Sequence, residues 1–337
     1  MSTAGTVLTG WQKSNVHIVL NATSISTAPT GTATYSIPNV GNGPWPRQNK
    51  PIRELGYQST GGTNSMRILS DYQVASVQRP SFTLDLPFTP TMLALAAVAV
   101  MQQRTTATAD IKVYPFTDPQ ASKFFGFETT YGANAGRTVT GAIGKTLKIS
   151  VPSAGADGGM PTLSLDCLAY STAQMDALTV TPATLHTTAL CQSTDWNVAV
   201  GTVGAAASAI GFCGFDLTVD NGAEVDPQVS ANPAAFELGE LTMKGTLKAV
   251  MSTTAGDEYN TILDNFLAGT PNKLQFNWGV AGATAYLQMP VLWDEPSEPQ
   301  KQGNVMVFDA PFRAYYRDAD EPEFMFVGMA TPLTIWA

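Results

Sequence analysis

The chain has 337 residues, a formal net charge of −9 and an isoelectric point near 4.7. Charged residues make up 13% of it, against about 25% in a typical globular domain, while 44% are hydrophobic. The surplus of acids argues against an electrostatic grip on DNA or RNA, because phosphates need lysine and arginine opposite them. The low charge favours a chain that covers much of its surface against other subunits.

The first 80 residues are rich in turn-forming residues and contain one short apolar strand at 16–20. Residues 40–66 form a long stretch rich in glycine and proline, and such a loop in a compact protein is usually either functional or disordered. In an assembly this loop would reach a neighbouring copy; a flexible surface loop is the alternative. The N-terminus shows neither the cationic segment nor the apolar run of a secretory signal.

Residues 81–101 predict a strand followed by a helix. In SFTLDL every second residue is apolar, and Thr89-Pro90 is typical of a helix start. The apolar run at 92–101 is about half of the ~20 residues that a membrane helix needs. We therefore expect a short helix packed on a sheet, with no membrane insertion.

The pattern of a strand, a helix and further strands occurs twice. Alternating strands at 144–152 and 162–170 complete its first occurrence, and the second spans about 240–316. A weakly patterned stretch near 175–185 separates the two. The sequence predicts a mainly β fold of two tandem antiparallel barrel or sandwich units, each with one short packed helix, at residues 1–180 and 181–337.

The clearest helix is predicted in DEYNTILDNFLAGT at 257–270. Its apolar residues recur at helical spacing, and Gly269 lies where a C-terminal cap belongs. The residues expected to pack against the sheet are Tyr259, Ile262, Leu263, Phe266 and Leu267.

The stretch GFDLTVDNGAEVD at 214–226 predicts a strand that runs into a tight turn. Asp216, Thr218 and Asp220 alternate with apolar residues, so they share the polar face of the strand. Asn221-Gly222 is the pair preferred in a two-residue type I′ turn. The spacing of the acids does not match a calcium-binding loop, which favours solvated carboxylates.

Motifs for catalysis or cofactor binding are missing from the sequence. His17 and His186 belong to no metal or catalytic motif. The three cysteines are widely spaced, and Cys167 and Cys213 lie in or beside apolar runs, which favours small buried residues over disulfides or metal ligands. The run GRTVTGAIGKT at 136–146 has Val139 where a phosphate-binding loop needs glycine. We expect no enzyme activity, no cofactor and no metal, although a carboxylate pair stays open because pairing is three-dimensional.

Four consecutive features of the C-terminal half carry a family resemblance: FDLTVDNG, GELTMKGTLKAVM, the helix at 257–270 and the strand KLQFNWG. In this order they resemble the tail tube proteins of long-tailed bacteriophages. PSFTLDLPFTP, with the helix after it and the glycine-rich strands at 141–170, resembles a more divergent copy of the same pattern.

The resemblance implies a structural role. Tail tube subunits form rings, usually of six barrels, which stack through a long loop and terminal arms into a channel that conducts DNA without binding it specifically. Members with two barrels close the ring as trimers; a hexamer of one barrel plus an accessory domain is the alternative. The implied partners are further copies and the tape measure, tail terminator and distal tail proteins, in a virion tail assembled in the host cytoplasm.

The resemblance also suggests where contacts lie. A channel for a polyanion is best lined by neutral and acidic residues. We expect Asp216, Thr218 and Asp220 to face the lumen, with a solvated outer surface as the alternative. Lys244 and Lys248 do not suit an acidic lumen and are expected to pair with acids of a neighbouring subunit.

The loop at 40–66 is assigned to the ring-to-ring contact, through Trp45, Arg47 and Arg53. A capsid decoration protein or a receptor-binding β protein would share this composition and is the alternative function. Such a protein forms discrete oligomers, whereas a tube subunit forms filaments.

Overall fold

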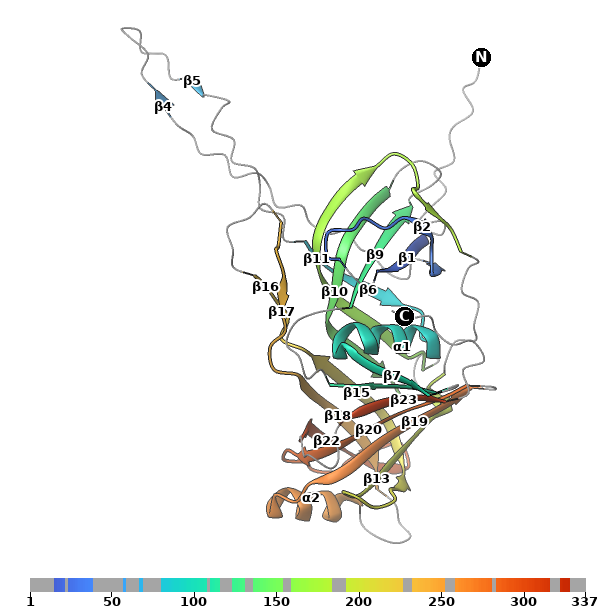
Figure 1. Ribbon diagram of the computed structural model, residues 1–337. Helices are drawn as coiled ribbons and strands as arrows, with labels where there is room; N and C mark the ends of the chain where they lie inside the picture. Colours follow the sequence, from blue (N-terminus) through green and yellow to red (C-terminus); the bar gives the residue numbers. More distant parts are fainter. Residues whose placement is uncertain are drawn as a thin grey trace, which may run out of the picture.

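Figure 1 shows the computed structural model of the chain. It describes residues 15–21, 24–38, 57–58, 67–68, 80–107, 110–115, 123–130, 136–153, 159–183, 192–226, 232–251, 258–280, 283–315 and 322–327. Over these residues the fold is mainly β with two α-helices, which confirms the predicted fold class.

The described part of the chain before residue 192 contains the first helix, α1 (Pro90–Met101), and a set of strands. They are β1 (Asn15–Asn21), β2 (Gly31–Thr32), β3 (Tyr35–Pro38), β4 (Tyr57–Gln58), β5 (Arg67–Ile68), β6 (Ser81–Leu86), β7 (Gln103–Ala107), β8 (Asp110–Tyr114), β9 (Phe124–Thr130), β10 (Gly136–Val151), β11 (Thr162–Met175) and β12 (Val180–Thr181).

The later elements begin with a 3-10 turn, η3 (Ser193–Asp195), and include the second helix, α2 (Glu258–Ala268). The strands are β13 (Trp196–Thr202), β14 (Ser208–Ile210), β15 (Phe212–Asp220), β16 (Glu224–Val225), β17 (Phe236–Glu237), β18 (Thr242–Val250), β19 (Asn272–Val280), β20 (Ala283–Trp293), β21 (Gln300–Gln302), β22 (Val305–Ala314) and β23 (Glu323–Val327).

One order of six strands occurs twice in the antiparallel sheet. In the first half the neighbours run β3-β1-β9-β10-β11-β6, and in the second half they run β14-β13-β19-β20-β22-β18. Corresponding strands also follow the same order along the chain. In each half the helix comes directly after the third of the six strands in chain order, which is β6 before α1 and β18 before α2. The two halves therefore share one topology.

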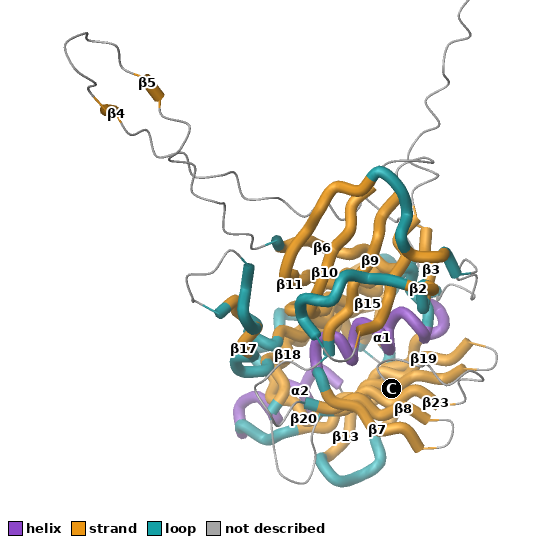
Figure 2. The backbone as a smooth tube through the Cα atoms, turned by 45° about the horizontal axis from the view of Figure 1, so that its top comes forward, coloured by secondary structure: helices purple, strands orange, loops and turns teal. Residues whose placement is uncertain are grey.

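Strand pairings also join the two halves. The first part of β10 pairs with β9, and its later residues 146–151 pair with β15. Strand β23 pairs with both β20 and β8, so this strand lies beside the N-terminal half. The result is one connected sheet (Figure 2), and the expected division into two separate barrels is not confirmed.

The polypeptide near residue 180, where the sequence suggests a boundary, is bound to the N-terminal sheet. Glu128 of β9, with 1% of its surface exposed, accepts hydrogen bonds from the backbone N–H groups of Thr179 (2.9 Å) and Val180 (3.0 Å). Strand β12 then pairs in parallel with β2. A buried carboxylate thus holds the chain where it leaves the first half.

Helix α1 begins as predicted but is more deeply buried than expected. Thr89 caps it by accepting a hydrogen bond from the N–H of Met92, and Pro90 occupies the first turn. The residues from Met92 to Met101 are all buried, so the helix does not simply rest one face on a sheet. Because PTMLALAAVAVM has no charged residue, strands can surround it (Figure 1).

Helix α2 packs through only part of the predicted face. Ile262 is buried, and Tyr259 and Phe266 pack against the core. Leu263 is half-buried, but Leu267 is 72% exposed, so its expected packing within the chain is not found. The helix ends at Gly269 (φ +60°), where the N–H groups of residues 269 and 270 bond the carbonyls of residues 266 and 265, a Schellman cap.

The predicted type I′ turn at Asn221-Gly222 is wrong. Among the described non-glycine residues only Gln102 has a positive φ, whereas a type I′ turn needs positive φ at both central positions. Strand β15 instead pairs with β18, which begins about 20 residues later at Thr242. Asn221 is fully buried and uses its side chain for long-range hydrogen bonds.

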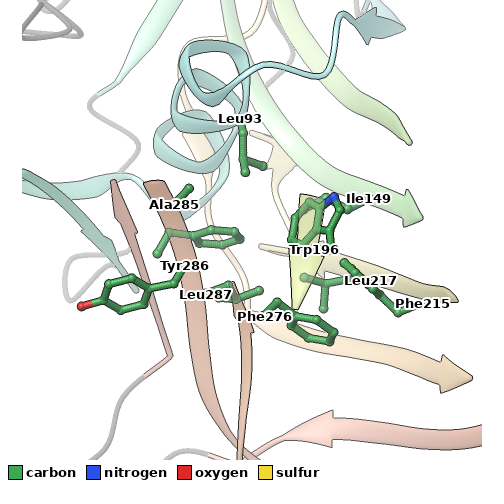
Figure 3. Close-up of a pocket in the computed structure, with 10 residues that line it drawn as sticks. Leu93, Ile149, Trp196, Phe215, Leu217, Phe276, Ala285, Tyr286 and Leu287 are labelled. Carbon is green, nitrogen blue, oxygen red and sulfur yellow. The ribbon is translucent and has the colours of Figure 1, made fainter. Parts of the chain in front are cut away.

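Aromatic residues fill the junction between α1 and the C-terminal strands. The indole rings of Trp196 and Trp278 stack at 5.9 Å, and Phe88 meets both edge-on. Figure 3 shows a small apolar cavity at this junction, which Leu93 of α1 lines together with Trp196 and Phe276. The cavity is a gap in the packing between the halves, and its lining side chains offer almost no polar surface.

Candidate functional site

A polar face extends across six adjacent strands, in the order β6-β11-β10-β15-β18-β22. Neighbouring residues are in register, so they form continuous rows across the sheet. One row consists of Asp85, Ser164, Lys148, Thr218, Lys244 and Arg313. The next consists of Thr83, Asp166, Thr146, Asp220 and Thr242. A third contains Thr162, Ser150, Asp216 and Thr246. Figure 2 shows β6, β11, β10 and β15 side by side.

The three residues predicted to face a lumen lie together in the middle of this polar face. Asp216 is exposed, opposite Ser150, whereas Thr218 and Asp220 are half-buried. Asp220 accepts hydrogen bonds from the hydroxyl of Thr146 (2.7 Å) and from the N–H of Gly222 (2.7 Å). Asp220 therefore has a structural role at the end of β15, while Asp216 is available to solvent.

The polar face carries charges of both signs, unlike the purely neutral and acidic surface expected. Lys148 pairs with Asp166 (Nζ–Oδ2 2.7 Å), and the hydroxyl of Thr83 donates to the same carboxylate (2.6 Å). Lys248 lies opposite Asp309 in register, and the expected pairing of Lys244 and Lys248 with acids of a neighbouring subunit stays a prediction. The charged residues of the face are Asp85, Asp166, Asp216, Asp220 and Asp309, with Lys148, Lys244, Lys248 and Arg313.

Sequence reasoning missed Lys148 and Asp166 as members of this face. Both positions were readable from alternation, because each lies between two apolar residues of its strand. Their pairing depends on the register of β10 and β11, which a β-bulge between Gly144 and Thr146 sets. That bulge has no clear sequence signal.

The predicted contact residues Trp45, Arg47 and Arg53 lie outside the described residues. The run at 136–146, which has some features of a phosphate loop, lies within strand β10. In the described part of the chain, no group of three or more His, Cys, Asp or Glu side chains could hold a metal ion. Neither described helix is long and apolar enough to cross a membrane.

Burial shifts the pKa values of His17, Cys167 and Cys213. Burial lowers the pKa of His17, which the nearby Glu128 partly opposes. It raises the pKa of the Cys167 thiol well above its usual value, and Asp166 adds to the increase. Burial also raises the pKa of Cys213, where Lys248 acts against the increase and Asp309 with it. Both cysteines are free thiols, as their spacing suggested.

The comparison with protein families identifies the family of the chain. The family model for phage tail tube proteins matches residues 23–314, which is most of the chain. The chain belongs to the phage tail tube protein family. No curated protein matches the sequence at a significant level.

As a tail tube protein, the chain is a structural subunit of a phage tail. Membership of a structural family also argues for a role without catalysis. A tail tube subunit belongs to the virion tail, where it contacts further copies of itself and other tail proteins.

Proposed function

We propose that copies of this tail tube protein assemble into stacked rings around a channel for DNA, and that the polar face borders this channel. The family match over residues 23–314 carries the proposal. The polar face supports it, because six strands offer a wide, continuous and hydrophilic surface on which five acids accompany four cations. Asp216, Thr218 and Asp220 lie at its centre.

The charge pattern suits the passage of a polyanion. An unopposed row of lysine and arginine would bind phosphates and hold the DNA in place. Here Lys148 pairs with Asp166 and Arg313 with Asp294, and Lys248 lies opposite Asp309, so an acid lies beside three of the four cations, while Lys244 lies opposite Arg313. The surface is therefore wettable and weakly adhesive, which favours translocation over binding.

The repeated topology of the chain suggests how the ring is built. The two halves, residues 1–180 and 181–337, act as two units of a ring, so three copies close a pseudo-sixfold ring. The repeated strand order supports this stoichiometry over a hexamer. Residues Trp45, Arg47 and Arg53 make the contact to the adjacent ring. The subunit has no enzymatic activity or cofactor, and tape measure, tail terminator and distal tail proteins are its partners during assembly in the host cytoplasm.

Electron microscopy of the purified protein across a concentration series tests this function. We expect hollow, evenly striated tubes or stacked rings with a threefold or pseudo-sixfold outline. Globular particles at every concentration, even after seeding with isolated tail tips, would contradict the proposal and favour a decoration or receptor-binding role.

A further inference from the structure

A segment of the C-terminal half lies across the N-terminal half. Between β15 and β18, the described residues 221–226 and 232–241 lie outside the main sheet and carry the β16–β17 ladder. We call this segment the strap. Phe236 and Leu238 of the strap form a buried cluster with Phe124 of β9 and Ile143 of β10, and the rings of Phe124 and Phe236 lie 6.3 Å apart. The strap therefore connects the second half to the first.

The repeated strand order identifies the equivalent position on the second half. Strands β9, β10 and β11 correspond to β19, β20 and β22. The last β9–β10 pair before Ile143 is Phe125 with Ala142, and the last β19–β20 pair is Asn272 with Val291. The residue after Val291 is Leu292, so Leu292 corresponds to Ile143. In the next ladder Ile143 faces Leu168, and Leu292 faces Arg313.

The equivalent position on the second half is much less covered. Ile143 is fully buried under the strap, whereas Leu292 is only half-buried. Pro271, just before β19, is also half-buried, and Tyr315, just after β22, is 40% exposed. We call Pro271, Leu292 and Tyr315 the uncovered row. These three side chains lie at the place where the first half has its strap, and Arg313, which faces Leu292 in register and pairs with Asp294, lies among them.

The sequence shows which segment corresponds to the strap. The strap begins with Asn221-Gly222 and ends with Glu237-Leu238-Gly239, and the segment between β3 and β6 contains Asn42-Gly43 and Glu54-Leu55-Gly56 in the same order. In the strap these short motifs contact the first half: Asn221 bonds the carbonyls of Val100 and Gly144, and Leu238 packs in the cluster of Ile143. A Cβ atom at Gly239 would lie 3.0 Å from the carbonyl oxygen of Gly222, so the two ends of the strap pack backbone to backbone.

We propose that the uncovered row of one copy receives the two motifs of a second copy, at residues 42–43 and 54–56. Leu55 would pack on Leu292, just as Leu238 shares a buried cluster with Ile143. Within one chain, the strap of the second half covers the first half. In a ring of such chains, the first half of one copy lies next to the second half of another copy. The segment that corresponds to the strap in the first half would therefore cover the second half of that other copy. The proposal rests on the proposed tube function and names the contact between neighbours within a ring. The residues between the two motifs are then left for the adjacent ring.

Cross-linking between two single-cysteine additions tests the contact directly. Leu55→Cys and Leu292→Cys are purified separately, mixed under assembly conditions and treated with a short bis-maleimide. We expect the mixed dimer to exceed, by about tenfold or more, the dimer from Leu55→Cys mixed with Lys301→Cys, which places the second thiol on exposed β21. Wild-type protein and each variant alone correct for the native thiols. Equal yields from the two mixtures would overturn the proposal.

A charge substitution provides the second test. Leu292→Asp should raise the concentration needed for ring formation by about tenfold, because a buried leucine contact would be lost. Met160→Asp, at a side chain that is 53% exposed, should leave it unchanged. Circular dichroism checks that both variants fold. Rings of Leu292→Asp at the wild-type concentration overturn only this contact, whereas wild-type protein that forms neither rings nor tubes overturns the proposed function.

Discussion

The side-chain nitrogen of Asn221 lies 2.9 Å from the carbonyl oxygen of Val100, so the end of β15 satisfies a carbonyl in the last turn of α1. The same nitrogen donates to the carbonyl of Gly144 (2.9 Å), and the side-chain oxygen accepts from the N–H of Ala223 (3.0 Å). One buried amide thus ties the first helix, strand β10 and the strap together.

Asn221→Ala should destabilise the protein by about 2–3 kcal/mol, because it leaves buried carbonyl groups without a donor. The free energy of unfolding, measured in urea, checks this value. Asn197→Ala on β13 is the control, since that side chain is exposed. A loss no larger than that of the control would show that water replaces the amide.

Gly144→Ala should separate α1 from β10. A Cβ atom at this position would lie 3.0 Å from the Cβ and the carbonyl carbon of Ala99, which is too close for an unshifted helix. We expect a loss of about 1–3 kcal/mol from overpacking. The matched control is Gly211→Ala, where the nearest atom would be at an ordinary 3.4 Å. Equal unfolding midpoints for the two variants would contradict the close contact.

His17 should make the stability depend on pH below neutrality. It is buried beside Ser36 (Nδ1–Oγ 2.8 Å) and faces Glu128 in register, and burial lowers its pKa. The unfolded chain, with a histidine pKa near 6.5, then binds the proton more readily. The stabilising contribution of neutral His17 is therefore complete above about pH 6.5 and is lost as the pH falls toward the folded pKa.

The test for His17 compares urea midpoints of the wild type and His17→Gln between about pH 7.5 and pH 5. Glutamine does not titrate, so the midpoint of the wild type should fall more steeply over this interval. Parallel curves for the two proteins would indicate that another group controls the pH dependence.

Asp216→Lys should slow DNA passage without preventing tube assembly. Asp216 is exposed and has only Ser150 and Thr246 opposite it, so the added lysine would meet a phosphate unopposed. Retention of DNA by assembled tubes should rise, with a log–log salt slope that is steeper by about 1. Asp264→Lys on the exposed face of α2 makes the same charge change elsewhere. The same retention by both variants would argue that the polar face lies away from the DNA.

Local sequence signals determined the elements of this protein. Thr89-Pro90 starts α1, Gly269 ends α2, and the alternation in FDLTVD separates Asp216 and Asp220 from the buried side of β15. These features depend on neighbours within a few residues, through hydrogen bonds to the backbone or through the period of a strand. A sequence reader can therefore locate them without knowing the fold.

Only the tertiary structure decided how the elements combine. Asn221-Gly222 has the composition of a tight turn, yet the asparagine side chain donates hydrogen bonds to the buried carbonyls of Val100 and Gly144. An unsatisfied carbonyl in the core raises the free energy of the fold by more than a local turn lowers it. The burial of α1 on all sides, the exposure of Leu267 and the pairing of Lys148 with Asp166 depend on strands far apart in the chain. Such contacts are set by register and packing between distant segments, which alternation within a single strand does not encode.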